Sequence, residues 1–224
     1  MLALGPDQQL IGDVIQRGDQ QLDGARAGEH ADRADGCCCG GCVRGKAQRP
    51  VHRALEQVLE AGPIQVLVNN AGIHDDAVFP GMSAHQWHRV IDVTLNGFYN
   101  VTHPLLMPMI RTRWGRIVNI SSVAALTGNR GQVNYAAAKG ALNSATRALA
   151  IELASRGVTV NAVAPGIIRS EMSEGHFDTA TIERLVPMQR AGEAGEVASL
   201  VDFLCSDSAA YITGQVVSIN GGMI

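Results

Sequence analysis

Three side chains in the middle of the chain have the types and the spacing for acid–base chemistry. Tyr135 and Lys139 are four residues apart in a helical pattern, so they are expected to share one helix face. A free phenol has a pKa of about 10, and a nearby cation lowers that pKa toward the working range. Ser122 precedes the tyrosine by thirteen residues, and its hydroxyl could donate a hydrogen bond to a substrate carbonyl. Together they predict a general acid, its electrostatic partner and an orienting donor.

The elements that must position these residues alternate in type beyond residue 50. Apolar runs typical of strands cover residues 64–68, 116–120, 158–163 and 215–219. Helical patterns cover residues 51–61, 135–155 and 193–204. A further helix is expected to begin after Ser83, where Gln86 completes a capping box. It runs toward Arg113, and Pro104 and Pro108 are expected to kink or divide it. This alternation predicts an α/β fold whose parallel sheet gathers chemistry at the carboxyl ends of its strands.

Short motifs accompany these residues in a fixed order. They are Asn69-Asn70-Ala71-Gly72, Ser122, Tyr135-x-x-x-Lys139, Pro165-Gly166 and Asn220-Gly221-Gly222. With them, the sequence from about residue 50 to its end resembles the short-chain dehydrogenase/reductase family. It is closest to the 3-oxoacyl-[acyl-carrier-protein] reductase branch over residues 115–122, 131–135, 158–166 and 211–215.

The resemblance implies a Rossmann-like doubly wound parallel sheet and an NAD(P)-dependent oxidoreductase. Hydride would pass from NADPH, with NADH not excluded, to a 3-oxoacyl thioester linked to acyl carrier protein or coenzyme A. Tyr135 would act as general acid, Lys139 would bind the nicotinamide ribose, and Ser122 would orient the carbonyl. The residues expected to border the cofactor are Asn70, Ala71, Gly72, Tyr135, Lys139, Pro165, Gly166 and Ile168.

The same resemblance implies two larger features. Residues 169–190 would form a mobile segment that covers the substrate, although a plain pair of surface helices remains an alternative. The protein would be a homo-oligomer, expected to be a tetramer built through the long helices around residues 83–113 and 134–155.

One departure concerns the helix after Ser83. The family commonly carries an asparagine there, which helps a water molecule to relay protons to the lysine, whereas Thr94 occupies the matching position. Asn96 lies two residues further, about 200° around a helix, so it does not replace the missing side chain. The threonine hydroxyl could still hold a water molecule.

The second departure concerns residues 1–49. Only 68 residues precede Asn69, whereas three β–α units of about 30 residues each are expected there. No phosphate-binding glycine turn and no residue that would read the adenosine ribose can be identified. We therefore expect residues 1–49 to be an atypical, poorly ordered segment, from an altered reading frame or start, and residues 50–224 to be the catalytic domain. The N-terminal strands would be incomplete or aberrant, and the alternative function is a catalytically impaired relic or an accessory subunit of a reductase oligomer.

Residues 35–47 read DGCCCGGCVRGKA and suggest two other kinds of site. Gly40 to Lys46 spell GxxxxGK, but polar residues precede them and Ala47 stands where a nucleotide triphosphatase needs Ser or Thr. Cys39 and Cys42 form a single pair, whereas a structural zinc ion normally has four ligands. Neither site is predicted, and no metal is expected. His74 and the pair Asp75-Asp76 are interpreted as surface or loop residues, with Asp75-Asp76 solvating a loop rather than pairing for acid–base work.

Composition excludes several classes of protein. The formal net charge is −3 and no basic run is present, which is not typical of a nucleic-acid binder. No apolar run is long enough to span a bilayer, and the first residues lack a signal-peptide pattern. Five cysteines, crowded at one place, do not describe a disulfide framework. We therefore expect a cytoplasmic enzyme with one hydrophobic core.

Overall fold

The computed structural model describes residues 51, 54–170 and 177–224. The expectations for residues 1–49, their cysteine run included, lie outside the described residues. So do residues 171–176, which belong to the expected substrate-covering segment. The division into a segment 1–49 and a domain 50–224 therefore stays a prediction.

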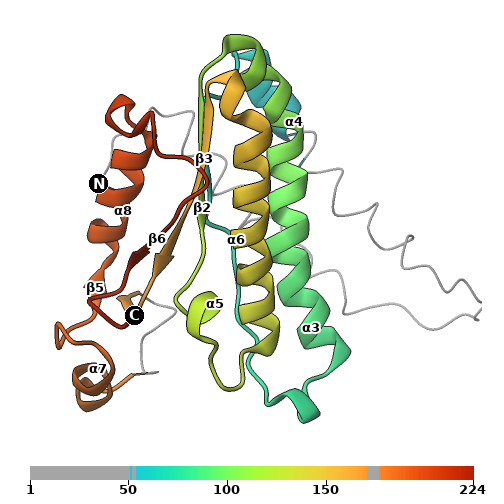
Figure 1. The fold of residues 1–224 in the computed structure, drawn as a ribbon. Coiled ribbons are helices and arrows are strands. Elements are labelled where there is room, and N and C mark those ends of the chain that lie inside the picture. The colour runs from blue at the N-terminus through green and yellow to red at the C-terminus, as the bar shows by residue number, and fades with distance from the viewer. Residues whose placement is uncertain (1–50, 52–53, 171–176) are drawn as a thin grey trace, which may run out of the picture.

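A parallel sheet forms the centre of the molecule (Figure 1). Its strands are β1 (Val66–Asn69), β2 (Gly115–Ile120), β3 (Val158–Pro165) and β6 (Val216–Ile219), in the order β1-β2-β3-β6. Strands β2 and β3 are buried along almost their whole length, which explains why their sequences are nearly continuous apolar runs. All four strands begin within two residues of the predicted positions, and the predicted α/β fold with a Rossmann-like parallel sheet is confirmed.

Helices cover both faces of this sheet (Figure 1). The longer ones are α3 (Ala84–Ile91), α4 (Gly97–Thr112), α6 (Val133–Leu153) and α8 (Ala194–Cys205). The shorter ones are α5 (Ala124–Thr127), α7 (Thr179–Leu185) and the 3-10 turns η1 (Phe79–Gly81), η3 (Ala154–Arg156) and η4 (Asp207–Ala209). Residues 54–60 are also helical. Neighbouring side chains of a strand point to opposite faces, so Ile117 packs in the cluster with α4 and α6, whereas Val118 packs in the cluster with α8.

A second, two-stranded sheet lies outside the main one. Strand β4 (Ile168–Arg169) pairs in parallel with β5 (Gly192–Glu193), and Ile168 lies opposite Gly192. The pairing joins the two ends of the segment that leads from β3 to α8.

The helix after Ser83 begins as predicted but is interrupted elsewhere. The Ser83 side chain accepts a hydrogen bond from the Gln86 backbone, and the Gln86 side chain accepts one from the Ser83 backbone, so the capping box is confirmed. Of the two alternatives for Pro104 and Pro108, division of the helix is wrong, because α4 continues through both prolines, and a kink stays a prediction. Leu105, next to Pro104, is fully buried, and such packing offsets the backbone hydrogen bonds that the prolines lack. The interruption is instead the π-helical segment η2 (Asp92–Asn96) between α3 and α4.

The turn from η3 into β3 depends on a glycine. Gly157 has a φ of +77°, and a Cβ atom there would overlap severely with the Arg113 carbonyl oxygen. Arg113 itself caps α4 with a left-handed backbone (φ 53°), so neither chain segment can move away easily.

We expect Gly157→Ala to lower the free energy of unfolding by about 3 kcal/mol or more, because backbone strain and a steric clash add up. The control is Gly214→Ala, since Gly214 has a similar φ of +72° and a Cβ atom there would lie 3.5 Å from Ala150 Cβ, an ordinary van der Waals distance. It should lose only about 1–2 kcal/mol. Urea unfolding of both variants measures the difference, and equal losses would refute the role of the clash.

Candidate active site

The three residues with acid–base chemistry meet at the carboxyl end of the sheet. Ser122 follows β2 by two residues, and Tyr135 and Lys139 lie in the first two turns of α6. The Ser122 hydroxyl lies beside the Tyr135 phenol, where hydrogen bonding with it lowers the pKa of the phenol. The Lys139 ammonium lies 5.8 Å from the centroid of the Tyr135 ring. The structure therefore brings together the residues that the spacing predicted.

Lys139 is almost entirely buried, with 2% of its surface exposed. Its Nζ donates a hydrogen bond of 2.7 Å to the carbonyl oxygen of Ile120, the last residue of β2. Burial disfavours the charged ammonium and lowers the pKa of Lys139 to about 8. The side chain is therefore still mostly a cation at neutral pH, because its pKa lies about one unit above pH 7.

The pKa of Tyr135 differs from the expectation of a lowered value. Burial raises this pKa first, the hydrogen bond with Ser122 lowers it, and the negative charge of Asp76 raises it again. The Lys139 ammonium is hydrogen-bonded to the Ile120 carbonyl rather than to the phenol. Tyr135 is thus protonated at neutral pH, as a proton donor must be.

Two of the residues predicted to border a cofactor lie against this group. A Cβ atom on Gly72 would lie 2.8 Å from Lys139 Nζ, so the absence of a side chain there makes room for the ammonium. The carbonyl oxygen of Pro165 accepts a 2.8 Å hydrogen bond from the backbone of Val123, which joins the end of β3 to the Ser122 segment. The backbone N–H of Gly166 donates to Ile219 on β6.

Replacement of Gly72 by alanine is expected to displace the Lys139 ammonium. We expect Gly72→Ala to lower kcat/KM on the order of 10²-fold, since a displacement of about 1 Å at a catalytic group has that effect. Gly195→Ala is the control, because a Cβ atom there has nothing within 4 Å. Steady-state kinetics test this prediction, and an unchanged kcat/KM for Gly72→Ala would contradict the packing argument.

Comparison with known proteins decides the family. The family model described as "Enoyl-(Acyl carrier protein) reductase" matches residues 44–224. This chain belongs to the short-chain dehydrogenase/reductase family.

Among similar relatives is the 3-oxoacyl-[acyl-carrier-protein] reductase FabG of Aggregatibacter actinomycetemcomitans, 49% identical over 158 residues, or 70% of this chain and 65% of the relative. The FabG protein of Aquifex aeolicus is 46% identical over 180 residues, covering 79% of this chain and 73% of the relative. An acetoacetyl-CoA reductase of Shinella zoogloeoides is 48% identical over 166 residues, covering 73% of this chain and 69% of the relative. The chain therefore spans about two thirds of the length of these relatives.

The remaining residues expected from the family resemblance are Asn70, Ala71 and Ile168. Asn70 and Ala71 follow β1 directly, between the strand and Gly72. Ile168 lies in β4 and lines a pocket of about 350 Å³ with Arg190, Asn220 and other residues of 167–168, 188–196 and 218–222. The lining of this pocket does not include Ser122, Tyr135 or Lys139.

Thr94, at the family's asparagine position, points inward from η2. It is 2% exposed, and its hydroxyl oxygen has no hydrogen-bond partner. Asn96 donates to the Asp92 side chain, and that it does not replace the family's asparagine stays a prediction. A buried hydroxyl without a partner is a typical place for an ordered water molecule, which is consistent with the role predicted for Thr94.

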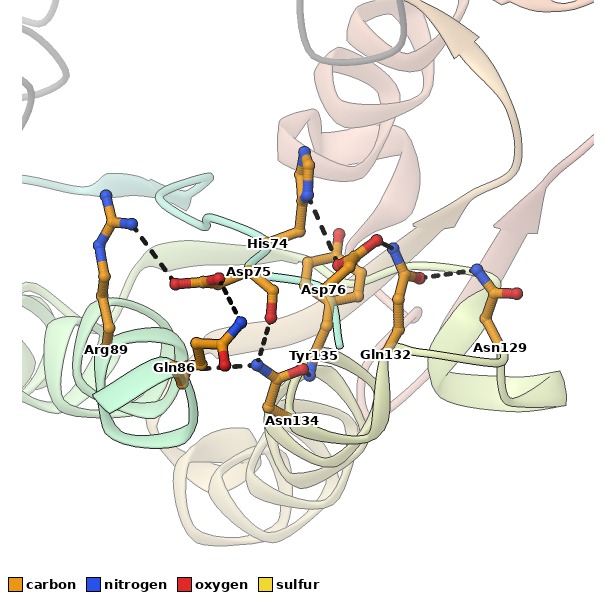
Figure 2. Close-up of polar contacts among 9 residues, drawn as sticks. All are labelled: His74, Asp75, Asp76, Gln86, Arg89, Asn129, Gln132, Asn134 and Tyr135. Atoms are coloured by element: carbon orange, nitrogen blue, oxygen red, sulfur yellow. Dashed lines mark hydrogen bonds and ion pairs between the residues drawn. The ribbon is translucent and has the colours of Figure 1, made fainter. Parts of the chain in front are cut away.

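The loop after β1 makes contacts that the sequence did not predict (Figure 2). Asp75 accepts a hydrogen bond from Gln86 (2.9 Å) and lies 3.6 Å from Arg89. Asp76 accepts one from Gln132 (2.8 Å), and His74 lies 3.5 Å from it. Asp75 and Asp76 lie in a loop, as interpreted from the sequence, and their hydrogen bonds to Gln86 and Gln132 join this loop to α3 and to the start of α6.

Asn134 connects this loop to Tyr135. It is fully buried, and its Nδ2 donates to the backbone carbonyls of Asp75 (3.0 Å) and Gln86 (3.2 Å). Its Oδ1 accepts a hydrogen bond from the backbone N–H of Tyr135 (2.8 Å). The sequence signal was an amide residue directly before Tyr135, but its partners lie 48 and 59 residues away.

The described part of the chain has neither a metal-binding cluster nor a membrane-spanning helix. Residues 51, 54–170 and 177–224 contain no group of three or more His, Cys, Asp or Glu side chains that could hold a metal ion. Over the same ranges, no helix has the length and apolar character that crossing a membrane requires.

Proposed function

We propose that this chain catalyses the NADPH-dependent reduction of a 3-oxoacyl thioester, linked to acyl carrier protein or coenzyme A, to the 3-hydroxy compound. The observation that carries the proposal is the arrangement of Ser122, Tyr135 and Lys139, with the serine hydroxyl on the phenol and the ammonium beside the ring. The names of the relatives, 3-oxoacyl-[acyl-carrier-protein] reductase and acetoacetyl-CoA reductase, support the substrate class.

Each of the three residues has one task in this reaction. Tyr135 holds a proton at neutral pH and donates it to the carbonyl oxygen as negative charge develops there. The Ser122 hydroxyl orients that oxygen by a hydrogen bond. Lys139 supplies a positive charge close to the ring and fixes the geometry through its bond to the Ile120 carbonyl.

The residues present fit the nicotinamide end of the cofactor. Lys139 Nζ has three N–H donors, and the Ile120 carbonyl accepts one, so donors remain for ribose hydroxyls. Gly72 leaves the space around this ammonium open because it has no side chain. The cofactor, when bound, supplies the hydride. The residues that would hold it are Asn70, Ala71, Gly72, Tyr135, Lys139, Pro165, Gly166 and Ile168.

Exposed apolar side chains on α4 and α6 support the predicted homo-oligomer. Tyr99 is 57% exposed, Met107 is 55% exposed and Ile151 is 81% exposed. The two helices lie side by side (Figure 1), so another copy of the chain could cover these side chains. The cytoplasmic location and the tetramer stay predictions.

Oxidation of NADPH, followed at 340 nm with acetoacetyl-CoA, tests the proposal. We expect turnover and an increase in Tm when NADPH is added, and the same assay with NADH gives the cofactor preference. The absence of both turnover and an increase in Tm would refute the reductase function for this chain.

That second result would favour the alternative, an impaired relic or accessory subunit. The observation behind it is that β1 lies at the edge of the sheet as far as the chain is described. Within residues 54–170 and 177–224, no glycine-rich turn precedes β1 to hold a pyrophosphate.

A further inference from the structure

The first turn of α6 carries the Tyr135 phenol, but the helix itself does little to fix this turn. Tyr135 is the third residue of α6, and the first backbone N–H groups of a helix have no carbonyl partner within it. The side chain of the N-cap residue Gln132 does not satisfy them. It is bonded to Asp76 and Asn129 instead. A bond from another group must therefore fix the Tyr135 backbone.

The side-chain amide of Asn134 supplies this bond and joins it to two other segments (Figure 2). Its Oδ1 accepts a hydrogen bond of 2.8 Å from the Tyr135 backbone N–H. Its Nδ2 donates to the backbone carbonyls of Asp75 (3.0 Å) and Gln86 (3.2 Å). The residue is 0% exposed, and both N–H donors of the amide are used. One buried side chain thus joins the start of α6 to the loop after β1 and to α3.

The segments that Asn134 contacts are themselves fixed. The Gln86 side chain accepts a hydrogen bond from the Ser83 backbone (3.0 Å) and donates one to the Asp75 carboxylate (2.9 Å). The backbone N–H of Ala77 donates to the Gly131 carbonyl (2.9 Å), which joins the loop to the residues before α6 a second time. The Asn134 amide therefore holds Tyr135 against a rigid support.

We propose that Asn134 is a positioning residue of this active site, whose side-chain amide fixes the Tyr135 phenol relative to the loop after β1. Residues 70–72 of this loop are those predicted to border the cofactor, and Asp75 follows Gly72 by three residues. Proton transfer depends strongly on position, because a displacement of about 1 Å can lower a rate by about 10²-fold. This inference rests on the proposed function, since the position of the phenol affects turnover only if Tyr135 donates a proton.

Asn134→Ala tests the proposal, because alanine leaves room for water to reach the two carbonyls that lose their donor. We expect kcat with acetoacetyl-CoA to fall on the order of 10²-fold, with little change in KM. The matched control is Asn161→Ala. Asn161 of β3 is also 0% exposed, and its amide donates to the Ile212 carbonyl (2.8 Å) and accepts from the Gln215 backbone N–H (3.1 Å). It should lower the urea midpoint similarly and leave kcat unchanged, and equal losses of kcat would overturn the proposal.

Two further variants distinguish positioning from a general effect on the fold. Asn134→Asp keeps the shape of the side chain and the oxygen that accepts from Tyr135, but lacks the N–H donors, so it should also lower kcat. It serves as the test if alanine does not fold, and full kcat in it would refute the link to the loop. In a Tyr135→Phe background, Asn134→Ala should lower kcat little further, because the hydroxyl that it positions is already absent. A further loss as large as in the single variant would overturn the proposal.

Tyrosine labelled with ¹³C at Cζ gives a readout that needs no turnover. The chain has three tyrosines, and the Tyr135 resonance is identified by its absence in Tyr135→Phe. We expect Asn134→Ala to shift or broaden this resonance and Asn161→Ala to leave it in place. An unmoved resonance in Asn134→Ala, or an equal change in both variants, overturns the proposal. Absence of turnover in the unmodified chain refutes the proposed function instead, and the resonance then decides the role of Asn134.

Discussion

Tyr135→Phe is expected to lower kcat by about 10²–10⁴-fold, because the variant lacks the proton that stabilises the developing alkoxide. The ring remains, so the packing of the side chain and its contact with the Lys139 ammonium are kept. KM and the increase in Tm with NADPH should therefore change little. Steady-state kinetics and thermal unfolding with NADPH measure both expectations.

The control for this variant is Tyr211→Phe. Tyr211 is fully exposed, so removal of its hydroxyl should leave kcat unchanged. Retention of activity in Tyr135→Phe would refute the role of the phenol as general acid. An equal loss in Tyr211→Phe would mean that the effect is not specific to the site.

Lys139→Met is expected to abolish reduction and yet to stabilise the fold at neutral pH. The buried ammonium has a pKa of about 8 instead of 10.5, so its charge costs the folded state about 3 kcal/mol below pH 8. Methionine fills a similar volume without charge. It leaves the Ile120 carbonyl without its donor, which costs about 1–3 kcal/mol, so the net gain at pH 7 is about 1 kcal/mol.

The pH dependence gives this prediction its sign. Between pH 8 and pH 10.5 the unfolded chain still binds the lysine proton and the folded chain does not, so the stability of the unmodified protein rises with pH. Lys139→Met lacks this slope, so its gain of about 1 kcal/mol at pH 7 should become a loss of about 2 kcal/mol at pH 10.5, relative to the unmodified protein. Tyr135→Phe keeps Lys139 and should keep the slope. Urea unfolding at pH 7 and pH 10.5 measures it, and parallel pH profiles would contradict the cost of burial.

The sheet and the proximity of Tyr135 to Lys139 could be predicted because their signals are local in sequence. Strands β2 and β3 are short apolar runs between polar turns, which is typical of strands buried on both faces. The spacing of four residues was enough to place Tyr135 and Lys139 on one helix face. The capping-box pattern of Ser83 and Gln86 was enough to predict where α3 begins.

The remaining features depend on contacts between distant parts of the chain. The sequence around Pro104 indicated a broken helix, but packing of α4 against the sheet decides that the prolines are accommodated. The raised pKa of Tyr135 follows from burial and from Asp76, neither of which is visible from the residues next to Tyr135. The role of Asn134 likewise required the loop after β1 to lie against α6.

The short pairing of β4 with β5 has a consequence for how this fold can vary. Residues 170–191 leave and re-enter the body of the protein at one point, since Arg169 pairs with Glu193 and Ile168 with Gly192. The entropy of closing such a loop grows only with the logarithm of its length, so that doubling it costs about 0.6 kcal/mol. Val186 and Ala191 are buried within this stretch, so we expect the fold to tolerate changes of length between Arg169 and Asp178 better than changes between Val186 and Gly192.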